Sequence, residues 1–306
     1  MQSFISNTLD DILKTTKSFQ DVVFVLPSQR SKVFVKQTFK DKIAVGFLPE
    51  IINVEQFINE VSGIEKADGV QLLFHFYTIY KGLEKAPVTF DVFSSWAFTV
   101  IQDFNEIDQH LIDTKQIFVY LRDIQRLKKW SVKGEFKETE LMKDHYSFLE
   151  KLHNFYNPFY NFLKEKNIGY QGLIYKESCQ KIDTYLSQNS NKKFFFIGFN
   201  ALNKAEEFLF QKVLETQNSE IYWDIDQTFF KGNHQAGKFI RKYKTDWKYY
   251  LTHPLKTISS SFKEPKNIEI IGASKNVTQI KYAGEIIKKL SSHSNTAYVL
   301  ADESLL

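Results

Sequence analysis

Acidic residues at short spacing are the first candidates for chemistry in this sequence. Two Glu-x-Lys pairs, Glu135 with Lys137 and Glu264 with Lys266, match half of the signature of metal-dependent DNA nucleases. In those enzymes carboxylates hold magnesium and a lysine orients the attacking water. Neither pair follows a strand hairpin that carries an aspartate, and chance matches are expected in a chain with 40 Lys and Arg and 36 Asp and Glu. We therefore favour ordinary surface residues over a nuclease centre.

Asp224 and Asp226 follow a predicted strand at a spacing that could hold a metal ion. We favour the alternative that they are polar caps at the strand end. The seven histidines show no ligand spacing, and the single cysteine, Cys179, excludes an internal disulfide framework and a cysteine-based zinc site. The sequence therefore predicts no catalytic residue and no metal site.

Nucleotide binding is the next chemistry to consider. A phosphate-binding loop needs glycines whose backbone N–H groups cradle phosphates, followed by Lys and Ser or Thr. The chain contains no G-x-x-x-x-G-K-[ST] run, and the turn at 27–30 after the first predicted strand has no glycine. The strand ending at Ile197 is followed by Gly198, Phe199 and Asn200 instead of acidic residues. If this is a nucleotide-hydrolase fold, we expect its ATP site to be lost, and we predict no cofactor.

One candidate site for DNA is the start of the helix after the first predicted strand. Ser28, Gln29, Arg30 and Lys32 lie there, where free N–H groups and the helix dipole favour an anion such as a DNA phosphate. The alternative is a helix capped by Ser28 with cations that face water. Both interpretations stay open from the sequence.

A second candidate is the basic segment 231–250, in which Lys238, Arg241 and Lys242 accompany aromatic residues. Cations interleaved with aromatics are typical of single-strand binding, through phosphate contacts and base stacking. The aromatic residues Phe239, Tyr243 and Trp247 also form a stripe at helical spacing, which favours packing on the sheet. A further basic run with Trp130 could face DNA or a partner equally well; it comprises Arg122, Arg126, Lys128, Lys129 and Lys133.

The elements that would position these residues alternate between strands and helices. Continuous apolar runs predict buried strands at 22–26, 194–197, 220–223, 268–271 and 297–300, with a short extended piece at 51–52. Ser28 and Asn53 are predicted helix caps, and the helix after Ser28 is expected to bury Val33, Phe34 and Phe39. From 70 to 187 apolar residues recur at helical spacing, which predicts a bundle. The pattern predicts an α/β fold with an open, mostly parallel sheet.

The composition is that of an ordinary globular protein, with 43% hydrophobic and 25% charged residues and a net charge of +4. The length of 306 residues suggests about two domains. No apolar run approaches the roughly 20 residues that span a bilayer, and the N-terminus lacks a secretion-signal pattern. We expect a cytoplasmic protein that does not enter a membrane. The last predicted strand would be left uncovered, so we expect the natural chain to continue.

Several segments, taken together and in order, resemble the AddB/RexB family, in the form of an inactivated superfamily I helicase of Bacteroidetes-type bacteria. The ordered set covers nearly the whole chain. It comprises Val25–Ser31, Phe34–Lys36, Phe47–Ile52, Glu55–Ile58, Asp103–Asp108, Tyr170–Tyr175, Phe196–Glu207, Ile221–Asp226 and Thr278–Lys281.

The resemblance implies two RecA-like helicase domains and a nuclease domain beyond residue 306. Residues 1–69 and 188–262 would form the first RecA-like domain, 70–187 an inserted helical subdomain, and 263–306 the start of a second, truncated RecA-like domain. Some family members keep a phosphate-binding loop; this sequence does not, which removes ATP binding from what the resemblance implies.

The function implied is that of a non-catalytic helicase-fold portion in double-strand-break repair and recombination. It would hold or read single-stranded DNA and pair with an active AddA-like helicase–nuclease subunit. The alternative is an interaction module that only docks this subunit, with the DNA contacts and the nuclease activity in the part of the protein that follows.

Overall fold

The computed structural model describes residues 3–43, 46–118, 120, 140–216, 218–290, 296–300 and 302. The basic run at 122–133 and the pair Glu135 and Lys137 lie outside these residues. The chain divides into two compact units, Met1–Phe262 and Lys263–Leu306.

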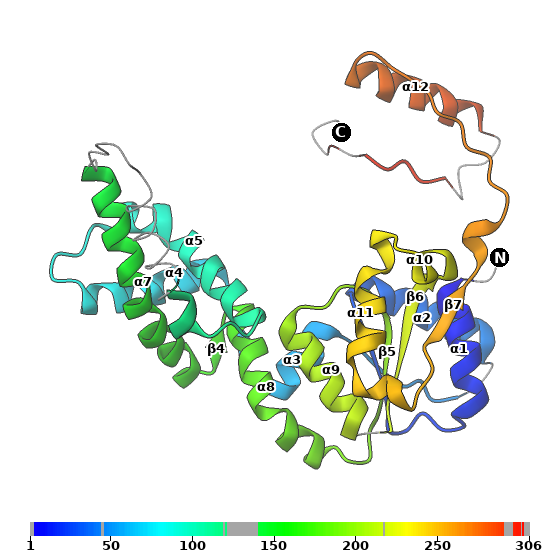
Figure 1. The fold of residues 1–306 in the computed structure, drawn as a ribbon, viewed down its shortest axis with the longest axis horizontal. Coiled ribbons are helices and arrows are strands. Elements are labelled where there is room, and N and C mark those ends of the chain that lie inside the picture. Colours follow the sequence, from blue (N-terminus) through cyan, green and yellow to red (C-terminus); the bar gives the residue numbers. More distant parts are fainter. Residues whose placement is uncertain are drawn as a thin grey trace. The chain divides into compact units, whose positions relative to one another are not determined.

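Five of the described strands of the first unit form one parallel sheet in the order β2-β1-β5-β6-β7. Figure 1 labels three of them, β5, β6 and β7. Phe24 in β1 lies opposite Ile51 in β2 and Phe195 in β5. All five residues of β1 are buried, as expected for a central strand covered on both faces. The predicted α/β fold with a parallel sheet is therefore confirmed. The strands are β1 Val22–Leu26, β2 Glu50–Asn53, β5 Lys193–Phe199, β6 Glu220–Asp226 and β7 Lys256–Ser259.

Helices α1 (Phe4–Thr15) and α2 (Gln29–Lys42) cover one face of the sheet. Val35 and Phe39 of α2 are buried against this face. The predicted stripe was wrong in part, because Val33 is 66% and Phe34 63% exposed. The apolar residues of α2 allow two stripes, one through Val33 and Phe34 and one through Val35 and Phe39. Val35 and Phe39, which are four residues apart and so lie on one side of the helix, face the strands.

The other face is covered by α3 (Val54–Ser62), α8 (Gln171–Gln188), α9 (Lys204–Thr216) and α11 (Lys238–Asp246). Phe57 of α3 lies edge-on to Phe194 and Phe196 of β5. Asn53 caps α3 through a reciprocal pair of hydrogen bonds with Gln56, which confirms the predicted cap. The short helix α10 (Gln227–Lys231) follows β6.

The helical block contains α4 (Gly69–Leu83), α5 (Phe90–Gln109) and α7 (Glu140–Glu165). Its buried rings, among them Phe76, Phe93 and Phe159, belong to one core that continues onto the sheet. Helix α8 falls in the segment predicted as the block, but it packs on α3 and α9 as well as on α5. The short strands β3 (Glu65–Lys66) and β4 (Ile168–Gly169) pair in parallel where the chain enters and leaves the block.

The second unit contains α12 (Asn276–Lys289). The strands predicted at 268–271 and 297–300 are wrong, because neither segment is a strand in the structure. A strand is stable only when its backbone groups are paired, and within the described part of this unit the two segments have no ladder partner. Ile270 is accordingly 92% exposed.

Candidate functional site

The strand order reverses between β1 and β5, because the chain passes from β1 to β2 on one side and later returns to β5 on the other. In doubly wound sheets this is where ligands bind, outside the carboxyl ends of the strands. A cavity of about 310 Å³ lies at this point. It is lined by Ser3, Phe4, Ile5, Leu26, Pro27, Ser31, Val35, Ile197, Gly198 and Asp224.

The lining of this switch-point cavity does not suit a nucleotide triphosphate. Most of its residues are apolar, and its charged residue is an acid, Asp224, whose pKa is raised by partial burial. Gly198 adopts a left-handed conformation with φ of 79°, and a Cβ there would lie 3.4 Å from the ring of Phe4. The start of α1 therefore lies close to the end of β5. The phosphates of a nucleotide need clustered hydrogen-bond donors and cations. The lining of this cavity is instead mostly apolar, and its charged residue is the carboxylate of Asp224.

The first predicted DNA-binding group surrounds the start of α2. Ser28 is the N-cap: its hydroxyl accepts from the Ser31 backbone N–H at 3.3 Å and lies 2.9 Å from the Ser31 hydroxyl. Lys32 donates to Gln56 Oε1 at 2.8 Å and so joins α2 to the cap of α3. Gln29 and Arg30 are exposed. The group thus combines a capped helix start with one exposed cation and one cation bound to the protein.

The exposed face of α2 extends this group along the helix. The fourteen residues of α2 carry five Lys or Arg and one Asp. Arg30, Lys36 and Lys40 are exposed, and Phe34 lies one turn after Arg30 with 63% of its surface exposed. Phe34 was expected in the core from its apolar character, so this exposed ring was not predicted. The signal that could have found it is the pair Val35 and Phe39, which already supplies a buried stripe.

The second predicted group is on α11. Arg241 donates from its guanidinium to the backbone carbonyls of Phe229 and His234, so this cation holds the turn before its own helix. Lys238 and Lys242 are exposed. Because the guanidinium of Arg241 is already engaged within the protein, it is a weaker candidate for DNA contact than the two lysines.

Two of the three residues in the predicted aromatic stripe, Tyr243 and Trp247, pack in the core, as the alternative interpretation holds for them. Tyr243 stacks on Trp223 of β6 with ring centroids 5.3 Å apart, and Trp247 lies 5.9 Å from the same ring. Both side chains are buried, whereas Phe239 is 41% exposed. Tyr243 and Trp247 are therefore not available to stack on bases.

The structure does not bring the two predicted groups together. Val35 and Phe39 place α2 in the core on one face of the sheet, whereas Ile240 and Tyr243 place α11 in the core on the other. Because the two groups lie on opposite faces of the sheet, they do not form one continuous basic surface. Of the two, α2 carries the larger exposed basic face.

Asp226 is a polar cap, as favoured from the sequence. Its carboxylate accepts from the backbone N–H of Thr228 at 2.9 Å and caps α10. It also accepts from the Phe262 N–H at 2.9 Å and from the Ser259 hydroxyl at 3.1 Å. No group of three or more His, Cys, Asp or Glu suited to a metal occurs in the part of the chain that the structure describes.

Two of the motifs that carry the family resemblance meet where α5 packs on α8. Asn105 Oδ1 accepts from the backbone N–H of Gly172 at 2.7 Å. The buried Asp108 accepts from the hydroxyl of Tyr170 at 2.6 Å and from Lys176 Nζ at 2.9 Å. Burial and the neighbouring carboxylate raise the pKa of Tyr170, which keeps its hydroxyl a donor. This network joins α5 to α8.

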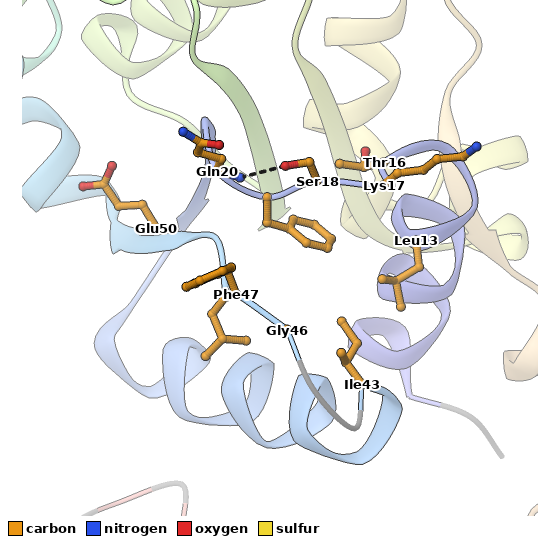
Figure 2. Close-up of a pocket in the computed structure, with 11 residues that line it drawn as sticks. Leu13, Thr16, Lys17, Ser18, Gln20, Ile43, Gly46, Phe47 and Glu50 are labelled. Carbon is orange, nitrogen blue, oxygen red and sulfur yellow. Dashed lines mark hydrogen bonds between the residues drawn. The ribbon is translucent and has the colours of Figure 1, made fainter.

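A larger cavity of about 910 Å³ is lined by residues of α1, by the loops at 16–20 and 46–48, and by Glu50 (Figure 2). Leu13 and Ile43 lie on one side of it, opposite Phe47 and Glu50. The Gln20 backbone N–H donates to the Ser18 hydroxyl at 3.4 Å. We assign no chemistry to this cavity.

Neither the models of known protein families nor the curated proteins compared with the chain gave a match. The resemblance to the AddB/RexB family thus stays a prediction from the ordered motifs. Of the helices that the structure describes, none has both the length and the apolarity required to cross a bilayer.

Proposed function

We propose that this chain is the non-catalytic helicase-fold portion of an AddB-like subunit that holds single-stranded DNA during double-strand-break repair. In this proposal it works in the cytoplasm beside an active helicase–nuclease subunit. The parallel sheet with the helices on its two faces, α8 included, corresponds in this proposal to the first RecA-like domain, and α4, α5 and α7 correspond to the inserted helical subdomain. A fold does not select a function by itself, so the proposal depends on a particular surface.

The observation that carries the proposal is the exposed face of α2. Arg30, Lys36 and Lys40 supply positive charge along a helix whose exposed ring, Phe34, is one turn from Arg30. Cations that follow a phosphate backbone, combined with aromatic rings that stack on bases, are the recurring solution for single-strand binding. The apolar, acidic switch-point cavity supports a role that needs no nucleotide.

The alternative of a module that only docks a partner subunit makes a different prediction for this surface. It requires no nucleic-acid affinity in the chain, because the DNA contacts would lie outside residues 1–306. The test is therefore direct binding of a labelled single-stranded dT oligonucleotide, measured by fluorescence anisotropy. Substitutions in α2 decide between the two functions.

Replacement of Phe34 by Ser is expected to lower the affinity without changing its salt dependence. Loss of one stacked base costs about 1–3 kcal/mol, which corresponds to roughly 5- to 150-fold. The combined substitution Arg30→Gln, Lys36→Gln and Lys40→Gln is expected to reduce the slope of log affinity against log salt by about 2, since each phosphate contact contributes about 0.7.

The matched control is the pair Lys238→Gln and Lys242→Gln on α11, across the sheet from α2. We expect this pair to leave the affinity nearly unchanged. Equal losses from the two sets of charge substitutions would show a diffuse electrostatic effect and would remove α2 as the site. An oligonucleotide that does not bind the unmodified chain at low salt would favour the docking-module alternative.

A further inference from the structure

A second exposed apolar surface lies on the helix pair α4 and α5. Val70 and Phe74 of α4 are 64% and 55% exposed, and Phe98 of α5 is 47% exposed. Phe74 stacks on Phe90 of α5, with ring centroids 4.9 Å apart and planes within 5° of each other. The ring of Phe98 lies 3.3 Å from where a Cβ on Gly69 would be. Val70, Phe74, Phe90 and Phe98 are here called the α4–α5 face.

This face is additional to the side of the helix pair that fills the core. Phe76 of α4 and Phe93 of α5 are fully buried, with ring centroids 5.3 Å apart. The helices therefore already have an apolar stripe that meets the requirement for packing. A second cluster of large side chains, open to solvent and partly stacked, indicates an interaction site rather than core material. Aromatic residues fixed in this way lose little entropy when a partner covers them.

The charge around the face selects the class of partner. The exposed charged residues of α5 are Asp91, Asp103 and Glu106, and α5 contains no Lys or Arg, whereas α4 carries one exposed cation, Lys81. The exposed Asp91 lies next to Phe90, and Asp68 caps α4 next to Gly69. Helix α2 has the opposite balance, with five cations and one acid. An acidic surrounding repels nucleic-acid phosphates and attracts cationic side chains.

We propose that the α4–α5 face docks a protein partner that presents apolar side chains surrounded by Lys and Arg. The apolar side chains would cover Phe74 and Phe98, and the cations would lie near Asp91 and the acidic residues of α5. This inference rests on the part of the proposed function that includes a partner subunit. It adds which surface binds the partner and which side chains the partner presents. It does not depend on DNA binding by α2.

The probes are two labelled synthetic helical peptides with the same leucine face, one flanked by lysine and the other by glutamate. Binding to the full chain is measured by fluorescence anisotropy. We expect the lysine-flanked peptide to bind and the glutamate-flanked peptide to bind at least tenfold more weakly. Substitution of Phe74→Ser with Phe98→Ser should lower the affinity for the lysine-flanked peptide at least tenfold, and Asp91→Lys should reduce the difference between the peptides.

The matched control is Phe34→Ser, which removes an exposed ring of similar exposure from α2. It should leave peptide binding unchanged, while Phe74→Ser with Phe98→Ser should leave binding of the dT oligonucleotide unchanged. The proposal is overturned if neither peptide binds, if both bind equally, or if the double substitution has no effect. It is also overturned if that substitution abolishes oligonucleotide binding, or if it abolishes self-association of the chain in sedimentation experiments.

The two proposals therefore fail separately. If only the α2 substitutions weaken oligonucleotide binding and neither peptide binds, the DNA-holding function is retained and the docking face is rejected. Peptide binding at the α4–α5 face without oligonucleotide binding would retain the docking face alone.

Discussion

Asp226 shows how one charged residue holds the end of the first unit. Its carboxylate accepts hydrogen bonds from Thr228, Ser259 and Phe262, which belong to α10, β7 and the segment that follows. These hydrogen bonds favour the ionised form and lower the pKa of Asp226 to about 2. The folded state is therefore stabilised whenever this carboxyl is ionised.

The pH dependence of unfolding tests this role. Because the folded-state pKa is below the ordinary value of about 3.9, the contribution is complete above that value and is lost as the pH falls through about 2. We expect Asp226→Asn to be less stable than the unmodified chain at pH 5 and to approach it at pH 2, measured by urea unfolding.

The control for this prediction is Asp224→Asn, two residues earlier. Partial burial raises the pKa of Asp224, so its protonation stabilises the folded state and the difference should have the opposite pH trend. Curves for Asp226→Asn and the unmodified chain that stay parallel between pH 5 and pH 2 would contradict the assignment.

Residue-scale features were predictable where they depend on neighbours in sequence. Ser28 and Asn53 cap helices through N–H groups three residues later, a spacing that is visible in the sequence. Arg241 was not predictable, because its acceptors are the carbonyls of Phe229 and His234, whose positions depend on the turn between two helices. The exposure of Phe34 likewise depends on which side of α2 faces the sheet.

At the scale of elements, α5 and α8 cross closely at Gly172. The Gly172 N–H donates to the Asn105 side chain, and a Cβ on Gly172 would lie 2.2 Å from the Asn105 carbonyl oxygen. Only glycine allows this approach without displacing one helix. The adjacent network around Asp108 depends on the same separation of the helices.

We expect Gly172→Ala to lower the free energy of unfolding by about 1–3 kcal/mol, which is the typical cost of adding a methyl group to a packed contact. The control is Gly82→Ala in α4, where nothing lies within 4 Å of the added Cβ and where alanine should stabilise by about 0.5 kcal/mol. Urea unfolding of both variants provides the comparison. If Gly172→Ala were as stable as Gly82→Ala, the close crossing would be disproved.

The predictability of elements depended on how local their stabilisation is. The strands at 22–26, 194–197 and 220–223 were found because burial on both faces requires continuous apolar runs. The edge strand β7, with sequence KTIS, has no such run and was missed. The segments at 268–271 and 297–300 have apolar runs but lack a pairing partner among the described residues of their unit.

At the scale of the whole molecule, the net charge of +4 conceals a separation of charge between elements. Helix α2 is strongly basic and α5 is strongly acidic. The sequence could indicate both helices, but it could not show that Phe34 on one and Phe74 on the other are exposed. Those exposures depend on tertiary packing, and the two proposals, of DNA binding by α2 and of protein docking by α4 and α5, rest on them.

The central claim is that the chain holds single-stranded DNA by electrostatics and stacking, without a nucleotide. The most direct test is the affinity of the unmodified chain for a labelled dT oligonucleotide across a salt series, with and without ATP and magnesium. We predict that log affinity falls linearly with log salt and that the two series superimpose. An affinity that does not respond to salt, or that changes when ATP is added, would contradict the account.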